Sequence, residues 1–64
     1  RAAQHMNDAA IRDHLREIIR DYWGMSMKEI EHVTGFPRRM LQKNLDAMLA
    51  AKTVIQEGGR YVAR

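Results

Sequence analysis

The sequence predicts a mainly α fold in which three helices are followed by a small C-terminal β-hairpin. Apolar residues recur at spacings of three and four through residues 7–51, which is typical of amphipathic helices. Residues 53–64 instead contain two short segments on either side of a Gly-Gly pair, which favours a hairpin. The length of 64 residues allows one domain with a small core. No apolar run approaches the ~20 residues of a membrane-spanning helix, so we expect no membrane partner.

The first helix is expected to begin after Asn7 and to end at Gly24. The Asn7 side chain can accept a hydrogen bond from the first turn, and Asp8 suits the positive end of the helix dipole. Glycine commonly ends a helix. We expect residues 1–6 to be a disordered or non-native N-terminal segment, outside the domain of residues 7–64. The apolar stripe of this helix consists of Ile11, Leu15, Ile18, Ile19 and Tyr22.

The second helix is expected to begin at Ser26, because Ser26 and Glu29 form the S-x-x-E pattern of a capping box. It is short, since Thr-Gly-Phe-Pro at residues 34–37 interrupts it. The glycine can turn the chain sharply, and proline is excluded from helix interiors but accepted in a first turn. The buried side of this helix is expected to contain Met27, Ile30 and Val33.

The third helix is expected over residues 37–51, with one apolar and one polar face. Asp46 lies three residues after Lys43 and is expected to pair with it weakly. The apolar face consists of Leu41, Leu45, Met48 and Leu49, and the polar face of Arg38, Arg39, Gln42, Lys43 and Asp46.

The hairpin is expected to contain strands at residues 53–56 and 60–64, joined through Gly58 and Gly59. Of the large apolar residues outside the helical stripes, Trp23 and Tyr61 are interpreted as core or boundary residues. The methionines at 25, 27 and 48 are expected to fill gaps in the core, with the methionine at 40 partly exposed.

This order of elements resembles the winged helix-turn-helix superfamily of DNA-binding domains. Residues 30–45 are similar to the helix-turn-helix of that superfamily, with Thr-Gly-Phe of residues 34–36 at its turn and Leu41 as the apolar anchor of its recognition helix. Residues 54–61 are similar to its wing.

The resemblance covers residues 11–62 and departs from the superfamily at two positions. Glu31 stands where a small residue often lets the two helices approach, and Asn44 stands where an apolar residue is common. Both departures concern the contact between the helices of the helix-turn-helix.

The resemblance implies double-stranded DNA as the partner. The helix of residues 37–51 would lie in the major groove, and the hairpin of residues 53–64 would contact the backbone or the minor groove. Arginine can bind guanine and glutamine can bind adenine through two hydrogen bonds each. The implied base contacts are Arg38, Arg39, Gln42 and Lys43, and the implied backbone contacts are Ser26, Lys28, Arg60 and Arg64.

The charge distribution favours the same function. Residues 1–36 contain five Lys or Arg against six Asp or Glu, whereas residues 37–64 contain six against two. A basic half is expected of a chain that faces phosphates, although an ordinary solvated surface is the alternative. The resemblance further implies a transcriptional regulator, which we expect in the cytoplasm, associated with the nucleoid in a bacterium.

No pattern in the sequence indicates catalysis or a cofactor. The three histidines have no metal-ligand spacing and no cysteine beside them, so we expect no metal. The acidic residues 13, 17 and 21 alternate with arginines on the first helix, which is typical of a solvated face. We expect no enzymatic activity and no cofactor.

Two other functions fit the same fold, because function resides in a site and not in a fold. The first is a protein-interaction or dimerisation module that uses the interleaved charges of the first helix. The second is the DNA-binding module of a replication, partition or translocase protein. The small size favours either a homodimer or a larger parent chain.

Overall fold

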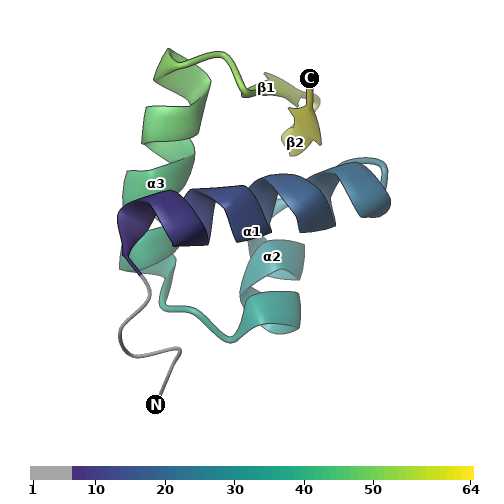
Figure 1. Ribbon diagram of the computed structural model, residues 1–64. Helices are drawn as coiled ribbons and strands as arrows, with labels where there is room; N and C mark the ends of the chain where they lie inside the picture. Colours follow the sequence, from purple (N-terminus) through teal and green to yellow (C-terminus); the bar gives the residue numbers. More distant parts are fainter. Residues whose placement is uncertain (1–6) are drawn as a thin grey trace.

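A computed structural model describes residues 7–64, so the expectation for residues 1–6 lies outside the described residues. Three helices precede an antiparallel hairpin that packs on α1 and α3 (Figure 1), which confirms the predicted fold class. This topology is compatible with a winged helix. The elements are α1 (Asp8–Asp21), α2 (Met27–Thr34), α3 (Arg38–Ala50), β1 (Val54–Glu57) and β2 (Arg60–Ala63).

The ends of the helices follow the local signals in the sequence, except that α1 ends at Asp21, three residues before the expected Gly24, because Trp23 and Gly24 both have positive φ. The Asn7 side chain accepts a hydrogen bond from the Ala10 amide at 2.8 Å. Ser26 and Glu29 each accept a hydrogen bond from the other's backbone amide, so the capping box is complete. Gly35 ends α2 in the left-handed conformation with φ 72°. The predicted boundaries of α2 and α3 are therefore confirmed to within a residue.

The segment before α2 pairs with β2 of the hairpin through an isolated β-bridge that the sequence did not predict. The Met25 amide donates to the Tyr61 carbonyl at 2.9 Å, and the Tyr61 amide donates back to the Met25 carbonyl at 2.7 Å. The segment between α1 and α2 is thereby fastened to the edge of β2. Gly24 comes so close to this strand that a Cβ atom there would lie 3.3 Å from the Tyr61 carbonyl oxygen.

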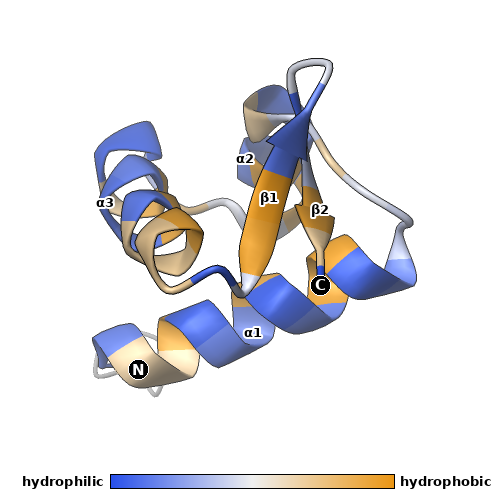
Figure 2. Cartoon of the chain, turned by 90° about the horizontal axis from the view of Figure 1, so that it is seen from above, coloured by the Kyte–Doolittle hydropathy of each residue, from blue (hydrophilic) through white to orange (hydrophobic). Residues whose placement is uncertain are grey.

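The core lies where all three helices meet the hairpin, and α2, α3 and the hairpin lie on one side of α1 (Figure 2). Most of the predicted apolar faces are buried as expected, but three residues are not. Tyr22, Val33 and Trp23 are 55%, 43% and 91% exposed. Tyr22 is the C-cap of α1 and Trp23 has φ 62°, so the chain leaves the helix before either side chain can turn inward. The buried apolar residues are Ile11, Leu15, Ile19, Met25, Ile30, Leu41, Leu45, Met48, Val54 and Tyr61.

Replacing Gly24 by alanine is expected to destabilise the domain by about 2–3 kcal/mol, because a side chain there is strained and also meets β2. The control is Gly35→Ala, which carries a positive φ but has nothing within 4 Å of the new Cβ. That change should cost only about 1 kcal/mol. Urea unfolding followed by circular dichroism measures both losses, and equal losses would contradict the close packing of Gly24 against β2.

Candidate nucleic-acid interface

The outer face of α3 carries all four residues that the resemblance assigns to base contacts. One face of the helix buries Leu41, Asn44, Leu45 and Met48. Because side chains recur every 3.6 residues, the remaining positions of the first two turns point to solvent, except for Met40, which is half-buried against the core. Arg38, Arg39, Gln42 and Lys43 are all exposed there.

Three of these four side chains contact neighbouring acidic groups. Arg38 forms an ion pair with Glu31 of α2. The Lys43 Nζ atom lies 3.1 Å from Asp8 Oδ2 in the first turn of α1. Arg39, by contrast, makes no ion pair or side-chain hydrogen bond with any residue that the structure describes. Arg39 is thus the cation of this face that is most available to an external anion.

The expected pairing of Lys43 with Asp46 is wrong. Asp46 instead accepts a hydrogen bond from Gln42 Nε2 at 2.8 Å, while Lys43 reaches across to α1. Residues four apart on a helix lie one above the other, so Gln42 and Asp46 are as well placed as Lys43 and Asp46. Asp8 offers Lys43 a carboxylate at the start of another helix, which sequence spacing cannot reveal.

The hairpin and the start of α2 meet beside Arg60. Its Nη2 atom donates to the Gly24 carbonyl at 2.6 Å, and its Nη1 atom lies 3.5 Å from Glu29 Oε1. The structure therefore brings together three of the four predicted backbone contacts, Ser26, Lys28 and Arg60. Lys28 is exposed, and the first-turn amides of α2 beyond the capping box have no acceptor within the helix.

Arg64 lies apart from this group. Its amide donates to the Thr53 carbonyl at 3.1 Å, and its carbonyl accepts a hydrogen bond from Arg16 of α1 at 3.3 Å. These contacts place it at the end of the hairpin opposite Gly58 and Gly59, because Val54 pairs with Ala63. The other seven predicted residues lie on α3, on the start of α2 and beside the hairpin turn.

The ion pairs on this surface are weak enough to be exchanged. Arg38, Lys43 and Arg60 are between 47% and 69% exposed, and exposed pairs contribute about 0–1 kcal/mol. The hydrogen bond from Lys43 lowers the pKa of Asp8. The hydrogen bond from the Ser26 amide, assisted by Arg60, lowers the pKa of Glu29. At neutral pH these carboxylates position the cations while leaving them accessible to solvent.

The lowered pKa of Glu29 makes folding sensitive to acid. The folded chain stabilises the ionised carboxylate of Glu29 more than the unfolded chain does. Its contribution to the free energy of unfolding is therefore present above the ordinary glutamate pKa and is lost as pH falls through the folded-state pKa. We expect Glu29→Gln, which retains an acceptor for the Ser26 amide, to reduce the loss of stability below about pH 4.5. Thermal unfolding of the wild type and of Glu29→Gln from pH 7 to pH 2.5 measures how the stability of each depends on pH. Parallel curves would contradict a role of the Glu29 carboxylate in acid sensitivity.

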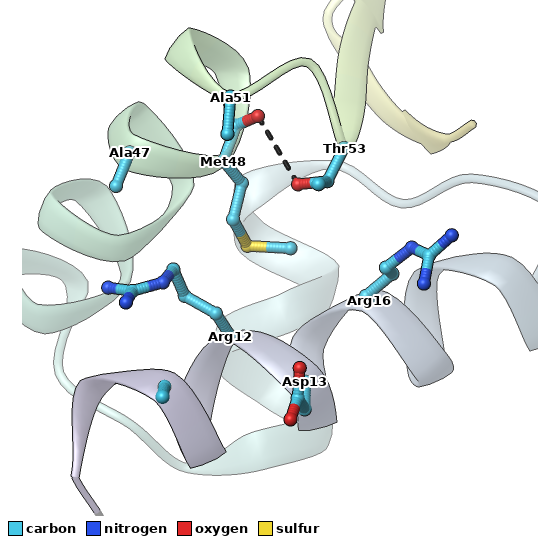
Figure 3. A pocket seen from close by; sticks show the side chains of 8 residues that line it. Arg12, Asp13, Arg16, Ala47, Met48, Ala51 and Thr53 are labelled. Atoms are coloured by element: carbon cyan, nitrogen blue, oxygen red, sulfur yellow. Dashed lines mark hydrogen bonds between the residues drawn. The ribbon is translucent and has the colours of Figure 1, made fainter.

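A groove between α1 and the C-terminal half of α3 lies outside this surface. It measures about 290 Å³, and the Met48 side chain points into it between Arg12 and Arg16 (Figure 3). Thr53 closes one end by donating to the Met48 carbonyl at 3.3 Å. Small side chains at Ala9, Ala47 and Ala51 keep the groove open.

Arg12 has a structural contact that sequence reasoning missed. Its Nη1 atom donates to Asn44 Oδ1 at 3.3 Å, while Asn44 Nδ2 donates to the Met40 carbonyl at 3.0 Å. Asn44 is fully buried, and these two hydrogen bonds satisfy both ends of its amide, as a buried polar group requires. The only signal in the sequence was a polar residue at an apolar position of α3.

Within residues 7–64, no cluster of three or more His, Asp or Glu side chains has the arrangement of a metal site. No helix in that part of the chain is long and apolar enough to cross a membrane. The chain matches no protein-family model, no curated protein and no solved structure.

Proposed function

We propose that this domain binds double-stranded DNA as a winged helix-turn-helix, with α3 in the major groove. The observation that supports this most directly is the outer face of α3. There Arg38, Arg39 and Gln42 are exposed while the opposite face of the same helix holds the core. A helix fits the major groove, about 12 Å wide, and guanidinium and amide groups match the edges of guanine and adenine.

The start of α2 and the hairpin turn support contacts to phosphate. Arg60 lies beside the first turn of α2, where amide groups without helical acceptors favour anions. Lys28 adds an exposed cation to the same region. In the proposed complex these groups contact the DNA backbone or the minor groove. They fix the register of α3 on the duplex, as phosphate contacts do in general.

We further propose that the domain serves a transcriptional regulator. A replication, partition or translocase protein would use the same surface, and its DNA targets would differ. A single module of this kind buries about 600–1,000 Å² of protein surface, so useful affinity calls for a second copy or an additional domain.

Fluorescence anisotropy with a labelled duplex, repeated over a range of salt concentrations, tests the proposal. We expect the logarithm of the binding constant to fall linearly with the logarithm of salt concentration, with a slope of about −2 to −4 for two to four neutralised phosphates. Absence of salt-dependent binding would refute the proposed function.

Chemical-shift mapping with the same duplex tests the surface. The largest shifts are expected at Arg39, at Lys28 and around Arg60, with little change at Glu17 on the far side of α1. A map centred on α1 would show that another surface binds the duplex.

A further inference from the structure

Asp46 is the single acidic residue of α3, and it lies on the face of the helix that the proposed complex turns toward DNA. Arg39, Gln42, Lys43 and Asp46 have the spacing i, i+3, i+4 and i+7, so they form one stripe along the helix. The buried residues of α3 form a second stripe with the same spacing on the opposite side. A carboxylate on the outer stripe repels phosphates, so general attraction to DNA does not account for it.

The Asp46 side chain contacts Gln42 and no cation. Gln42 Nε2 donates to Asp46 Oδ1 at 2.8 Å, and both side chains are exposed. Within residues 7–64, no lysine or arginine forms an ion pair with Asp46. In that same range Gln42 makes no other side-chain hydrogen bond. The contact therefore leaves the Oε1 atom and the second Nε2 hydrogen of Gln42 to meet a ligand.

The chemistry of the carboxylate determines which way the Gln42 amide is turned. A carboxylate has only acceptors, whereas an amide has a donor at one end and an acceptor at the other. The hydrogen bond to Asp46 therefore requires the Nε2 end of Gln42, and the amide cannot exchange its two ends without losing that bond.

An amide with a fixed orientation distinguishes the two purines. In the major groove, adenine offers an acceptor at N7 and a donor at N6, whereas guanine offers acceptors at both N7 and O6. The free Nε2 hydrogen and the Oε1 atom of Gln42 match adenine. Against guanine, the same orientation sets Oε1 beside the O6 oxygen, which is an unfavourable contact between two acceptors.

We propose that Asp46 is a positioning residue that fixes the Gln42 amide in the orientation that binds adenine and rejects guanine. This inference rests on the proposed DNA binding and extends it, because Asp46 contributes to base discrimination without contacting a base. When the carboxylate is absent, the amide can turn over and donate Nε2 to guanine, so either purine is accepted. Discrimination of this kind needs an unfavourable contact with the wrong base as well as a favourable one with the right base.

Base substitution in a selected duplex tests the proposal. Selection from a random duplex library with the wild-type chain gives a preferred duplex, and each adenine in it is then replaced by guanine together with its pairing base. Fluorescence anisotropy gives the ratio of the two dissociation constants at each position. We expect one position at which the wild type prefers adenine at least about fivefold and at which Gln42→Ala removes the preference.

Two variants of Asp46 separate orientation of the amide from simple support of the helix. Asp46→Asn can still form a hydrogen bond with Gln42, but in either sense, because its own amide both donates and accepts. We expect it to lower the adenine preference at that position at least about threefold. Asp46→Glu again offers only acceptors, so we expect its preference to stay within about twofold of the wild type.

Glu57→Gln is the matched control for Asp46→Asn. It removes one exposed carboxylate from the hairpin, away from α3, and should leave the adenine preference unchanged. A preference is a ratio of two affinities of the same protein, so a change in overall charge largely cancels from it. Circular dichroism should show that every variant is folded, since residues 42, 46 and 57 are all exposed.

The outcomes distinguish this inference from the proposed function. Suppose the wild type binds duplex DNA but Asp46→Asn keeps the full adenine preference, or no preference responds to Gln42→Ala. Either result would overturn the positioning role of Asp46 and leave DNA binding in place. A wild type without salt-dependent binding to any duplex would refute the proposed function, and this inference with it.

Discussion

Replacing Arg39 by glutamate is expected to weaken binding to duplex DNA by about ten- to a hundredfold at moderate salt. Arg39 lies on the outer face of α3, and its substitution removes no ion pair or side-chain hydrogen bond with any described residue. The change removes a donor to a base or phosphate and adds a negative charge at the DNA surface. Fluorescence anisotropy across a salt series measures the loss.

The matched control for Arg39→Glu is Lys52→Glu. It makes the same change of charge at an exposed position in the connection between α3 and β1, so a purely global charge effect would weaken both variants equally. Equal weakening, or undiminished binding by Arg39→Glu, would contradict a specific role of α3.

The same series distinguishes the two kinds of contact. Loss of a phosphate contact reduces the salt slope by about 0.9, whereas loss of a base contact changes the preference among sequences. Lys43→Glu is less informative, either alone or combined with Arg39→Glu. That change would set a carboxylate against Asp8 and disturb the start of α1.

The parts of the fold that the sequence predicts are those encoded locally. The capping box at Ser26 needs only residues three apart, and the turn at Gly35 needs only a backbone that accepts positive φ. The hairpin likewise follows from the Gly-Gly pair between two short strands. Each of these features is determined within a few residues, so a single sequence is sufficient to find it.

The features that escaped prediction depend on residues far apart in the chain. The bridge from Met25 to Tyr61 forms because the segment after α1 passes the edge of β2. Arg60 bends back to the Gly24 carbonyl for the same reason, although the sequence alone suggested a side chain directed only toward phosphate. On the candidate surface, sequence predicted which residues of α3 are exposed, but not that Arg38 and Lys43 are paired with Glu31 and Asp8.

Asn44 shows how an apparent mismatch in the sequence becomes a contact between helices. A polar residue on the apolar face of α3 left the packing of that helix in doubt. In the structure, Asn44 is fully buried, and its amide joins Arg12 of α1 to the Met40 carbonyl of α3. A buried polar group with both partners present is tolerated, because the hydrogen bonds replace those lost from water.

The neighbouring Leu45 is as fully buried as Asn44, but its surroundings offer no hydrogen-bond partners for an amide. The two single substitutions Leu45→Asn and Asn44→Leu should therefore have very different effects on stability. Leu45→Asn loses about 2–3 kcal/mol of apolar burial and adds about 1–3 kcal/mol for an amide without hydrogen bonds. A total of about 3–6 kcal/mol approaches the whole stability of a domain this small, so we expect the variant to be largely unfolded. Circular dichroism at 25 °C should show loss of helix.

Asn44→Leu should remain within about 1 kcal/mol of the wild type in urea unfolding. It gives up two hydrogen bonds, each with a net contribution of about 1 kcal/mol, and gains burial of an apolar side chain of similar size. The half-buried Arg12 side chain can turn to solvent when its acceptor is lost. A large loss in Asn44→Leu would instead show that the bond from Arg12 fixes the orientation of α3 against α1. In that case DNA affinity should fall together with stability, because the exposed face of α3 is positioned by the same packing.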